Sequence, residues 1–232
     1  MRKTLTTLVP VLNEEQFLEK SIQRLLLIEE IDQIFLIDDC STDNSINIMK
    51  DLENKHSKIS VLESPYDTNK GKGSAISRAK ELVTTDYIII HDADLEYNPQ
   101  DIKKMYELIS KSTDLFVIGS RFLKNNKVQL YYRTHFANKL FSKLFSIVNN
   151  VKITDIATCY KLMPSHFFKT SNFNEKGFAI EIEMVSRYLK LSNNVKEIPI
   201  SYIPRTYQEG KKIKISDGFM YIISIFKYRF FS

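Results

Sequence analysis

Short apolar runs alternate with longer stretches of helical periodicity through the first half of this 232-residue chain. The apolar runs are rich in β-branched residues, and they predict strands at 5–11, 34–37, 59–62, 87–90 and 115–118. Between them, apolar residues recur every three or four positions, which predicts amphipathic helices within 17–26, 46–52, 75–82 and 102–109. This alternation constrains the chain to an α/β sandwich with a mostly parallel central sheet.

The second half of the chain is less regular. It predicts a helix within 136–148, an irregular stretch to about 178, a helix through 181–189 and a strand at 195–202. A polar, basic connector then leads to a final apolar helix. Because no repeat and no clear boundary occurs, we expect residues 1–215 to form one domain. Residues 216–232 are expected to form an attached amphipathic helix rather than a second domain.

Composition narrows the choice of partner and compartment. The net charge of +5 and the pI near 9.0 favour an anionic partner. No run of five basic residues and no zinc-finger or RNP-type motif occurs, so nucleic acid is not expected. Two widely separated cysteines, a start without a signal-peptide pattern and the lack of a bilayer-spanning apolar segment predict a cytoplasmic protein. Contact of such a protein with the cytoplasmic face of the membrane is a further possibility that the sequence leaves open.

Polar clusters directly follow four of the predicted strands. Because the carboxyl ends of parallel strands meet at one edge of the sheet, where α/β proteins bind ligands, we expect these clusters to form one pocket. The clusters are VPVLNEE (9–15), DDCSTDNS (38–45), HDADLE (91–96) and GSR (119–121).

Three acids alternate after the most apolar of these strands. Asp92, Asp94 and Glu96 would repel one another on one side of an extended segment unless a cation neutralised them. Carboxylate oxygens suit Mg²⁺ or Mn²⁺, which proteins often hold with one or two carboxylates together with substrate phosphates. We therefore expect these three residues to be metal ligands.

The stretch NKGKGSA (69–75) places two glycines and two lysines, Lys70 and Lys72, just before a predicted helix. Backbone N–H groups and lysines at such a position suit a phosphate group, although the spacing is not that of a P-loop. A plain glycine turn is the alternative.

Taken in order, these motifs resemble the family 2 glycosyltransferases, and they are most similar to the dolichyl- or polyprenyl-phosphate sugar (mannose or glucose) synthases. The motifs are V-P-x-x-N-E, D-D-x-S-x-D, N-x-G-K-G-x-A, D-A-D-L and G-S-R, and the resemblance runs from residue 5 to about 215. It implies a GT-A fold, a Rossmann-like sandwich that binds a nucleotide-diphospho-sugar, either a GDP- or a UDP-sugar, with a divalent metal.

The resemblance also assigns roles on the donor side. Pro10, Asn13 and Glu14 would line the nucleoside pocket, and Asp38 and Asp39 would hold the base and ribose. Asp92, Asp94 and Glu96 would hold the metal and the diphosphate, with Asp94 central to catalysis. The cations expected to face the diphosphate are Lys72, Arg205, Lys211 and Lys212.

On the acceptor side, DIATCYKLM (155–163) resembles the acceptor loop of these synthases, and Arg121 and Arg133 resemble the arginines that receive the acceptor phosphate. Two departures occur: Cys40 and Cys159 stand where relatives usually have glycine. If either position needs a positive φ, cysteine would strain it. The chain lacks tryptophan, so the Q-x-x-R-W motif of processive synthases is absent and polymer synthesis is not expected.

The chemistry of the acceptor separates the remaining alternatives. A sugar hydroxyl must lose a proton as it attacks and needs a base, for which Asp155 is the obvious spare acid. A polyprenyl phosphate is already an oxyanion and needs only positioning and positive charge, so we expect it to be the acceptor in a single inverting displacement. A soluble transferase acting on a glycan or lipopolysaccharide hydroxyl is the alternative, and a sugar-nucleotide pyrophosphorylase is a more remote one.

The final helix carries Phe219, Ile222, Ile223, Phe226 and Phe230, with Lys227 and Arg229 close by. Such a composition suits peripheral contact with a lipid interface. Packing on the core or on a second subunit in a homodimer is the equal alternative.

Overall fold

The computed structural model describes residues 2–123, 132–205 and 215–231, with the backbone alone for 132, 133 and 215–217. A seven-stranded sheet in the order β3-β2-β1-β4-β6-β5-β7 forms its centre. The strands are β1 (Leu5–Val11), β2 (Gln33–Asp38), β3 (Ile59–Leu62), β4 (Tyr87–Ile90), β5 (Phe116–Ser120), β6 (Lys161–Pro164) and β7 (Val195–Pro199). Neighbouring strands run parallel except at β6, which is antiparallel to both β4 and β5. The predicted α/β architecture with a mostly parallel sheet is confirmed.

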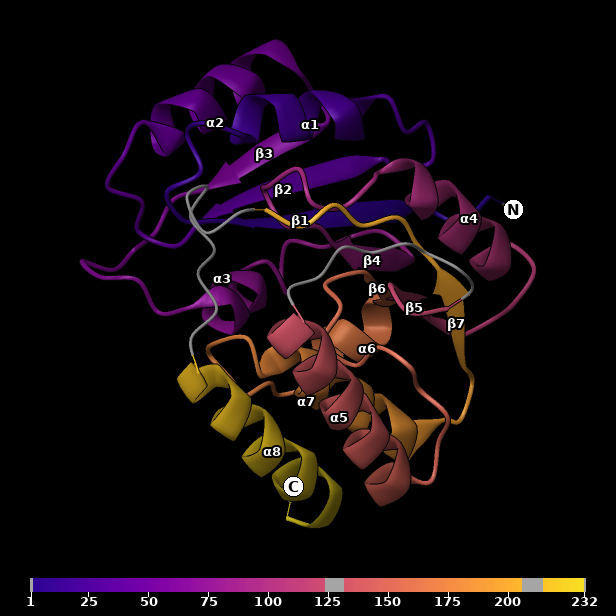
Figure 1. The fold of residues 1–232 in the computed structure, drawn as a ribbon. Coiled ribbons are helices and arrows are strands. Elements are labelled where there is room, and N and C mark those ends of the chain that lie inside the picture. The colour runs from indigo at the N-terminus through magenta and orange to yellow at the C-terminus, as the bar shows by residue number, and fades with distance from the viewer. Residues whose placement is uncertain (1, 124–131, 206–214, 232) are drawn as a thin grey trace.

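Eight helices in the described residues cover the two faces of the sheet. Figure 1 shows α1 and α2 on one side and α3, α6 and α7 on the other, with α5 and α8 lying side by side beyond them. The helices are α1 (Leu18–Leu26), α2 (Ser45–Lys55), α3 (Lys72–Arg78), α4 (Gln100–Ile109), α5 (Tyr132–Asn149), α6 (Ser165–Thr170), α7 (Ile180–Leu191) and α8 (Ile215–Phe230).

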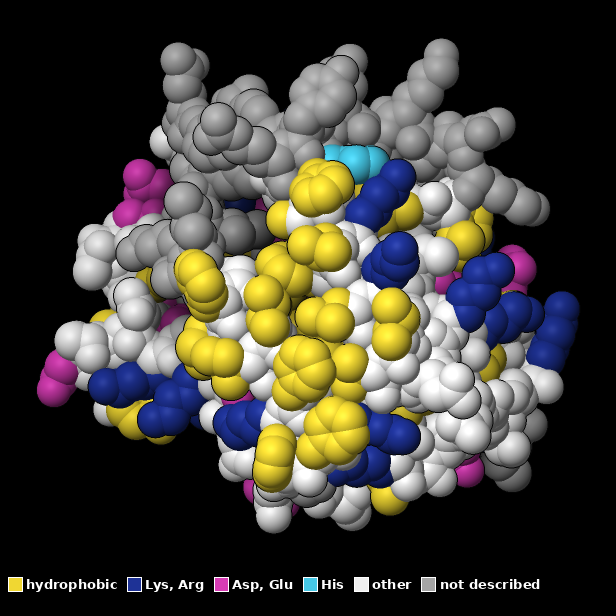
Figure 2. Space-filling view, turned by 60° about the horizontal axis from the view of Figure 1, so that its bottom comes forward, with side chains coloured by type: hydrophobic (Ala, Val, Ile, Leu, Met, Phe, Trp, Pro, Cys, Tyr) yellow, Lys and Arg dark blue, Asp and Glu magenta, His cyan; other side chains and the backbone are white. Residues whose placement is uncertain are grey.

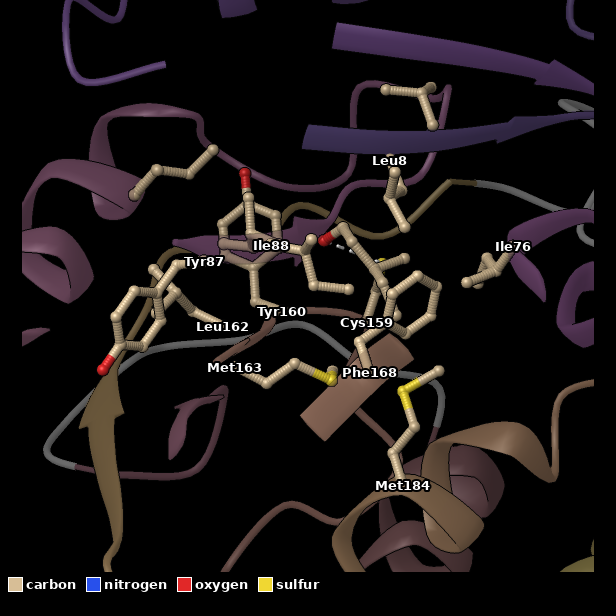
Figure 3. Close-up of a cluster of buried hydrophobic side chains, with 14 of the residues drawn as sticks. Leu8, Ile76, Tyr87, Ile88, Cys159, Tyr160, Leu162, Met163, Phe168 and Met184 are labelled. Carbon is tan, nitrogen blue, oxygen red and sulfur yellow. Dashed lines mark hydrogen bonds between the residues drawn. The ribbon is translucent and has the colours of Figure 1, made fainter. Parts of the chain in front are cut away.

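The core lies on both faces of the sheet, and β4 is buried along its whole length. On the side shown in Figure 3, Ile88 of β4 lies among Tyr160, Leu162 and Phe168 from the β6–α6 region. Each fully buried side chain of this kind stabilises the fold by about 1.5–3 kcal/mol. The strand that ends in the acid cluster is thereby held rigidly, which fixes where the acids begin.

Two elements differ from the sequence prediction. The stretch expected to be irregular up to about 178 contains β6 and the short helix α6. The four residues of β6, KLMP, begin with a lysine and end with a proline, so they carry no alternation that would predict a strand. The last strand also ends earlier than expected, at Pro199, and Tyr202 makes only an isolated bridge with Tyr97.

Candidate active site

The carboxyl ends of β1, β2 and β4 open into a cavity of about 620 Å³. Its lining includes these residues that the sequence singled out: Pro10, Glu14, Asp39, Lys72, Asp92, Asp94, Glu96 and Arg205. Gly71, Gly177, Phe178 and Tyr202 also line it. The polar clusters after three strands therefore share one cavity, on the side of the sheet where a parallel α/β fold places its ligands. The expectation that all four clusters would form this pocket is wrong in one respect, because no residue of GSR (119–121), which lies in the described part of the chain, is part of the lining.

Asp92 is neutralised from within the protein. The Lys72 ammonium donates to Asp92 Oδ1 at 2.8 Å and lies 2.7 Å from Glu181 Oε1, and Glu181 Oε2 accepts from Lys161 at 2.8 Å. Burial is the largest influence on the pKa of Asp92 and works to raise it, but the charge and hydrogen bond of Lys72, together with Cys159 and His91, lower that pKa. Burial works to lower the pKa of Lys72, yet Asp92, Cys159 and Glu181 together raise it well above its usual value. Alternating charges thus run from the cavity wall into the core.

Asp94 has a different environment. Its Oδ2 accepts from Arg205 Nη2 at 2.9 Å, while Arg205 Nη1 donates to Glu14 Oε2 at 2.9 Å. Burial, followed by the charges of Asp92 and Glu96, raises the pKa of Asp94 to about 8 in spite of Arg205. Burial and the neighbouring acids thus disfavour the ionised form of Asp94 more strongly than Arg205 favours it.

Glu96 anchors the segment that follows β7. It accepts from the Tyr202 hydroxyl at 2.7 Å and from the backbone N–H of Arg205 at 2.6 Å, and its carbonyl accepts from the N–H of Ile203 at 2.8 Å. Residues 202–205 are thereby held directly against the turn that carries Asp94 and Glu96.

The three acids do not converge on one point. Asp92 turns to Lys72, Asp94 to Arg205 and Glu96 to Tyr202. Within the described ranges, no group of three or more His, Cys, Asp or Glu side chains is arranged to hold a metal ion. Asp94 nevertheless fits a dication that is held by one or two carboxylates and by phosphates of a ligand, because it is a hard oxygen donor, buried and crowded by like charge.

The acids and the amide at the ends of β1 and β2 hold the backbone of the neighbouring turns. Asp38 accepts from the backbone N–H groups of Cys40 and Ser41, each at 3.0 Å. Asp39 accepts from the N–H groups of Lys70 and Gly71 at 2.9 and 2.8 Å. Asn13 Oδ1 accepts from the N–H of Thr42 at 2.7 Å. In the described part of the chain, Asp38 and Asn13 lie outside the cavity lining and Asp39 is part of it. A role for these three in binding the base and ribose stays a prediction.

The glycine loop closes the same wall. Gly71 has a φ of +95°, and a Cβ there would lie 2.6 Å from the backbone oxygen of Lys176. Only glycine fits this position, because both the backbone angle and the space exclude a side chain. The loop therefore lies directly on the 175–177 segment, which brings Gly177 and Phe178 into the cavity lining.

Of the two cysteines that replace the usual glycine, one adopts the strained conformation. Cys40 has a φ of 69°, whereas Cys159 is not among the described residues with positive φ. The Cys159 side chain is buried, with its Sγ 3.5 Å from the Ile90 carbonyl. The 155–163 segment therefore accommodates its cysteine without backbone strain, and the strain falls on the turn after β2.

Arg121 forms a buried, bidentate ion pair. Its Nε and Nη2 donate to Asp155 Oδ2 and Oδ1 at 2.7 and 2.8 Å, and its backbone N–H donates to Oδ2 at 3.0 Å. Glu197 in turn accepts from the backbone N–H groups of Thr154 and Asp155. The guanidinium lies 5.0 Å from the ring of Tyr202, which lines the cavity. Two of its three nitrogens are thus committed to holding the 154–155 turn.

The remaining predicted cations lie outside the described residues: the Arg133 side chain and both Lys211 and Lys212.

Glu181 and Lys161 were not predicted as part of the site. A signal existed, because FAIEIEMV (178–185) places two acids in an otherwise apolar helix, and acids that are buried need charged partners.

Comparison with known proteins decides the family. The model of glycosyl transferase family 2 matches residues 6–170. The chain belongs to this family. The predicted family, and the class of enzyme that it comprises, are confirmed.

Two archaeal relatives fit the predicted subgroup. A dolichol-phosphate mannosyltransferase of Pyrococcus furiosus is 28% identical over 96% of this chain and 62% of its own length. A UDP-N-acetylglucosamine–dolichyl-phosphate N-acetylglucosaminyltransferase of Methanococcus voltae is 27% identical over 94% of this chain and 92% of its own length. The resemblance to polyprenyl-phosphate sugar synthases is therefore confirmed, although the chain spans less than two thirds of the first relative.

A solved structure confirms the fold. Glucosyl-3-phosphoglycerate synthase of Mycobacterium tuberculosis, crystallised with Mn²⁺, UDP and phosphoglyceric acid, matches with a TM-score of 0.75. The match covers 99% of this chain and 80% of that protein at 15% identity. At this identity the likeness extends to the fold alone.

Proposed function

We propose that this chain transfers a sugar from a nucleotide-diphospho-sugar to the phosphate of a polyprenyl lipid, with inversion at the anomeric carbon. Family membership and the dolichyl-phosphate relatives support the reaction class. The observation that carries the choice of acceptor is the Arg121–Asp155 pair. Asp155 is fully buried and both of its oxygens accept from Arg121, so the acid that a hydroxyl acceptor would need as a base is already engaged.

A phosphate acceptor removes the need for that base. Its second pKa is about 6, so one of its oxygens is a ready nucleophile at neutral pH. That oxygen would attack the anomeric carbon while the bond from this carbon to the diphosphate breaks, and the nucleoside diphosphate would leave. Arg121 does not line the cavity, but its guanidinium lies 5.0 Å from the ring of Tyr202, which does. From there Arg121, with Arg133, would orient the acceptor.

On the donor side, the cavity between β1, β2 and β4 would hold the nucleotide-sugar, either a UDP- or a GDP-sugar. Asp94, aided by Asp92 and Glu96, would hold Mg²⁺ or Mn²⁺, which would offset the charge of the departing diphosphate. Lys72 is fixed between Asp92 and Glu181, so its contribution would be a positive cavity wall rather than a mobile contact. Arg205 would face the diphosphate from the opposite wall, together with Lys211 and Lys212.

The acceptor is tested with a matched pair of lipids. We expect sugar to be transferred to a polyprenyl phosphate in the presence of Mn²⁺ and not to the polyprenol of the same length, because only the phosphate needs no base. The measurement is transfer of radiolabel from a panel of UDP- and GDP-sugars into the lipid phase. Transfer to the polyprenol at a comparable rate would contradict the proposal and favour a hydroxyl acceptor.

A lipid acceptor implies contact with a membrane, and α5 and α8 supply a suitable surface. We name this surface the α5–α8 face; its exposed apolar side chains are Phe136, Leu140, Ile147, Phe219, Met220, Ile222, Ile223, Phe226, Phe230 and Phe231. Figure 2 shows hydrophobic side chains gathered there with Lys and Arg side chains beside them. Helix α5 contains Lys139 and Lys143 and no acid, and α8 ends with Lys227 and Arg229.

The predicted amphipathic character of α8 is not established. Large side chains lie on both of its sides, with Tyr221, Ile225 and Tyr228 buried and Phe219 and Phe230 exposed. No helix in the described ranges is long and apolar enough to cross a bilayer. We propose that the α5–α8 face rests on an anionic bilayer, since apolar area with flanking lysine and arginine is the composition such a surface binds.

Vesicle binding tests this face. We expect the double variant Phe219→Ser/Ile223→Ser to bind anionic phosphatidylglycerol vesicles at least roughly tenfold more weakly than the unaltered chain, because two inserting side chains are lost. Leu27→Ser/Leu191→Ser is the matched control, since both leucines are exposed and neither belongs to α5 or α8. Equal loss in both double variants, or no vesicle binding by the unaltered chain, would refute the assignment.

A further inference from the structure

Arg205 occupies the place where a dication would approach Asp94. Its guanidinium bridges Glu14, which follows β1, and Asp94, which follows β4, so it joins two walls of the cavity. The ring of Phe17 lies 5.6 Å from the same guanidinium. Arg205 Nε is buried and has no hydrogen-bond partner in the described part of the chain. A buried N–H donor without a partner is costly, so this arrangement leaves Arg205 with a donor that an additional acceptor would satisfy.

The counter-ions of Asp92 and Asp94 differ in how firmly they are held. Lys72 opens α3, and Glu181, in the first turn of α7, holds it from behind. The side chains of Lys72 and Glu181 are 8% and 2% exposed. Arg205, in contrast, stands in no helix or strand, and its guanidinium contacts side chains of other segments. The lysine that faces Asp92 is therefore held from behind by a second acid, whereas the guanidinium that faces Asp94 is held only by carboxylates that line the cavity.

We propose that Arg205 is an exchangeable internal counter-ion, which leaves Asp94 when a dication binds there and then donates to the diphosphate that arrives with the cation. This inference rests on the proposed function. It adds that the site binds the dication alone more weakly than it binds the dication together with the nucleotide. The dication alone must displace a guanidinium and binds weakly. The dication with its nucleotide binds strongly, because the released guanidinium gains new acceptors.

The test measures binding rather than turnover. Mn²⁺ affinity is determined by electron paramagnetic resonance at pH 8.5, without nucleotide, for the unaltered chain, Arg205→Gln and Arg205→Lys. We expect Arg205→Gln to bind Mn²⁺ roughly tenfold more tightly, because the competing charge is gone. Arg205→Lys keeps the charge and is expected to stay within about threefold of the unaltered chain. Lys50→Gln, which removes an equal charge from an exposed ion pair with Glu63, is expected to leave the affinity unchanged.

A second titration, with UDP or GDP present, should reverse the order. Arg205→Gln is then expected to bind the Mn²⁺–nucleotide pair more weakly than the unaltered chain, since the diphosphate has lost a donor. A residue that merely supported the fold would weaken both kinds of binding.

Mn²⁺ binding without nucleotide that is unchanged or weaker in Arg205→Gln, or equal shifts in the glutamine and lysine variants, would overturn this inference and leave the proposed function standing. Failure of the unaltered chain to bind Mn²⁺ under either condition would instead remove the metal from the proposed function, and the exchange with it.

Discussion

Asparagine in place of Asp94 is expected to lower sugar transfer by at least roughly a thousandfold while the chain remains folded. The carboxylate is the expected main ligand of the dication, and an amide of the same shape supplies neither its charge nor its affinity for a hard cation. The fold should tolerate the change, because Asp94 already lies among like charges and Arg205 keeps its contact with Glu14. Transfer and the urea midpoint of unfolding are measured together.

The matched control for this substitution is Asp51→Asn, which changes an exposed acid on α2 and is expected to leave transfer and unfolding unaltered. Turnover of Asp94→Asn close to that of the unaltered chain would exclude Asp94 as a metal ligand. Loss of transfer together with unfolding would leave the catalytic assignment without support.

The same substitution should remove a pH dependence of stability. Burial and neighbouring acids raise the pKa of Asp94 from 3.8 to about 8. Between these values the folded state retains a proton that the unfolded state has lost, so the contribution of Asp94 to stability falls as the pH rises through this window. With a chelator present, the melting temperature of Asp94→Asn should therefore fall less between pH 5 and pH 8 than that of the unaltered chain. An equal fall in both would contradict the assigned pKa.

Asparagine in place of Asp155 is expected to destabilise the chain by about 3–5 kcal/mol, because it leaves the buried Arg121 guanidinium without its counter-charge. Asp155 is fully buried and Arg121 is 5% exposed. Burial works to lower the pKa of Arg121, but the charge and hydrogen bonds of Asp155, with Tyr97 and Tyr202, together raise it well above its usual value. The free energy of unfolding in urea checks the expectation. Lys50→Gln serves as the control, because its exposed pair with Glu63 is worth only about 0–1 kcal/mol.

The outcome for Asp155 also separates the two acceptor chemistries. An unchanged unfolding free energy with complete loss of transfer would identify Asp155 as a base and contradict the proposed phosphate acceptor. A large loss of stability, with transfer retained per folded molecule at low temperature, agrees with a residue that holds the acceptor loop in place.

The edge of the sheet at which the site lies could be predicted from the sequence, because strand ends are visible as apolar runs and ligands bind where parallel strands end. Asp92, Asp94 and Glu96 stood out since three acids directly after three isoleucines have no reason to exist in a solely structural strand. Strand β6 could not be predicted, because what makes it a strand is its pairing with β4 and β5, and this pairing arises only in the tertiary fold.

The partners of the charged residues were also beyond the sequence. The pattern indicated that the acids needed cations, but it could not show that Lys72 belongs to Asp92 and Arg205 to Asp94, since these pairs form only when distant segments meet. Arg121 was expected to face the acceptor, and nothing local indicated that Asp155, 34 positions later, would accept from two of its nitrogens. Sequence thus located the charges, and the fold decided which of them are already neutralised.

The most direct measurement is diffraction from crystals grown with Mn²⁺ and UDP or GDP, with data collected to locate the anomalous signal of manganese. We expect a manganese peak in contact with an Asp94 carboxylate oxygen and with the nucleotide diphosphate, inside the cavity between β1, β2 and β4. A nucleotide bound there without manganese, or manganese bound only at some other part of the surface, would contradict metal-dependent transfer at this site.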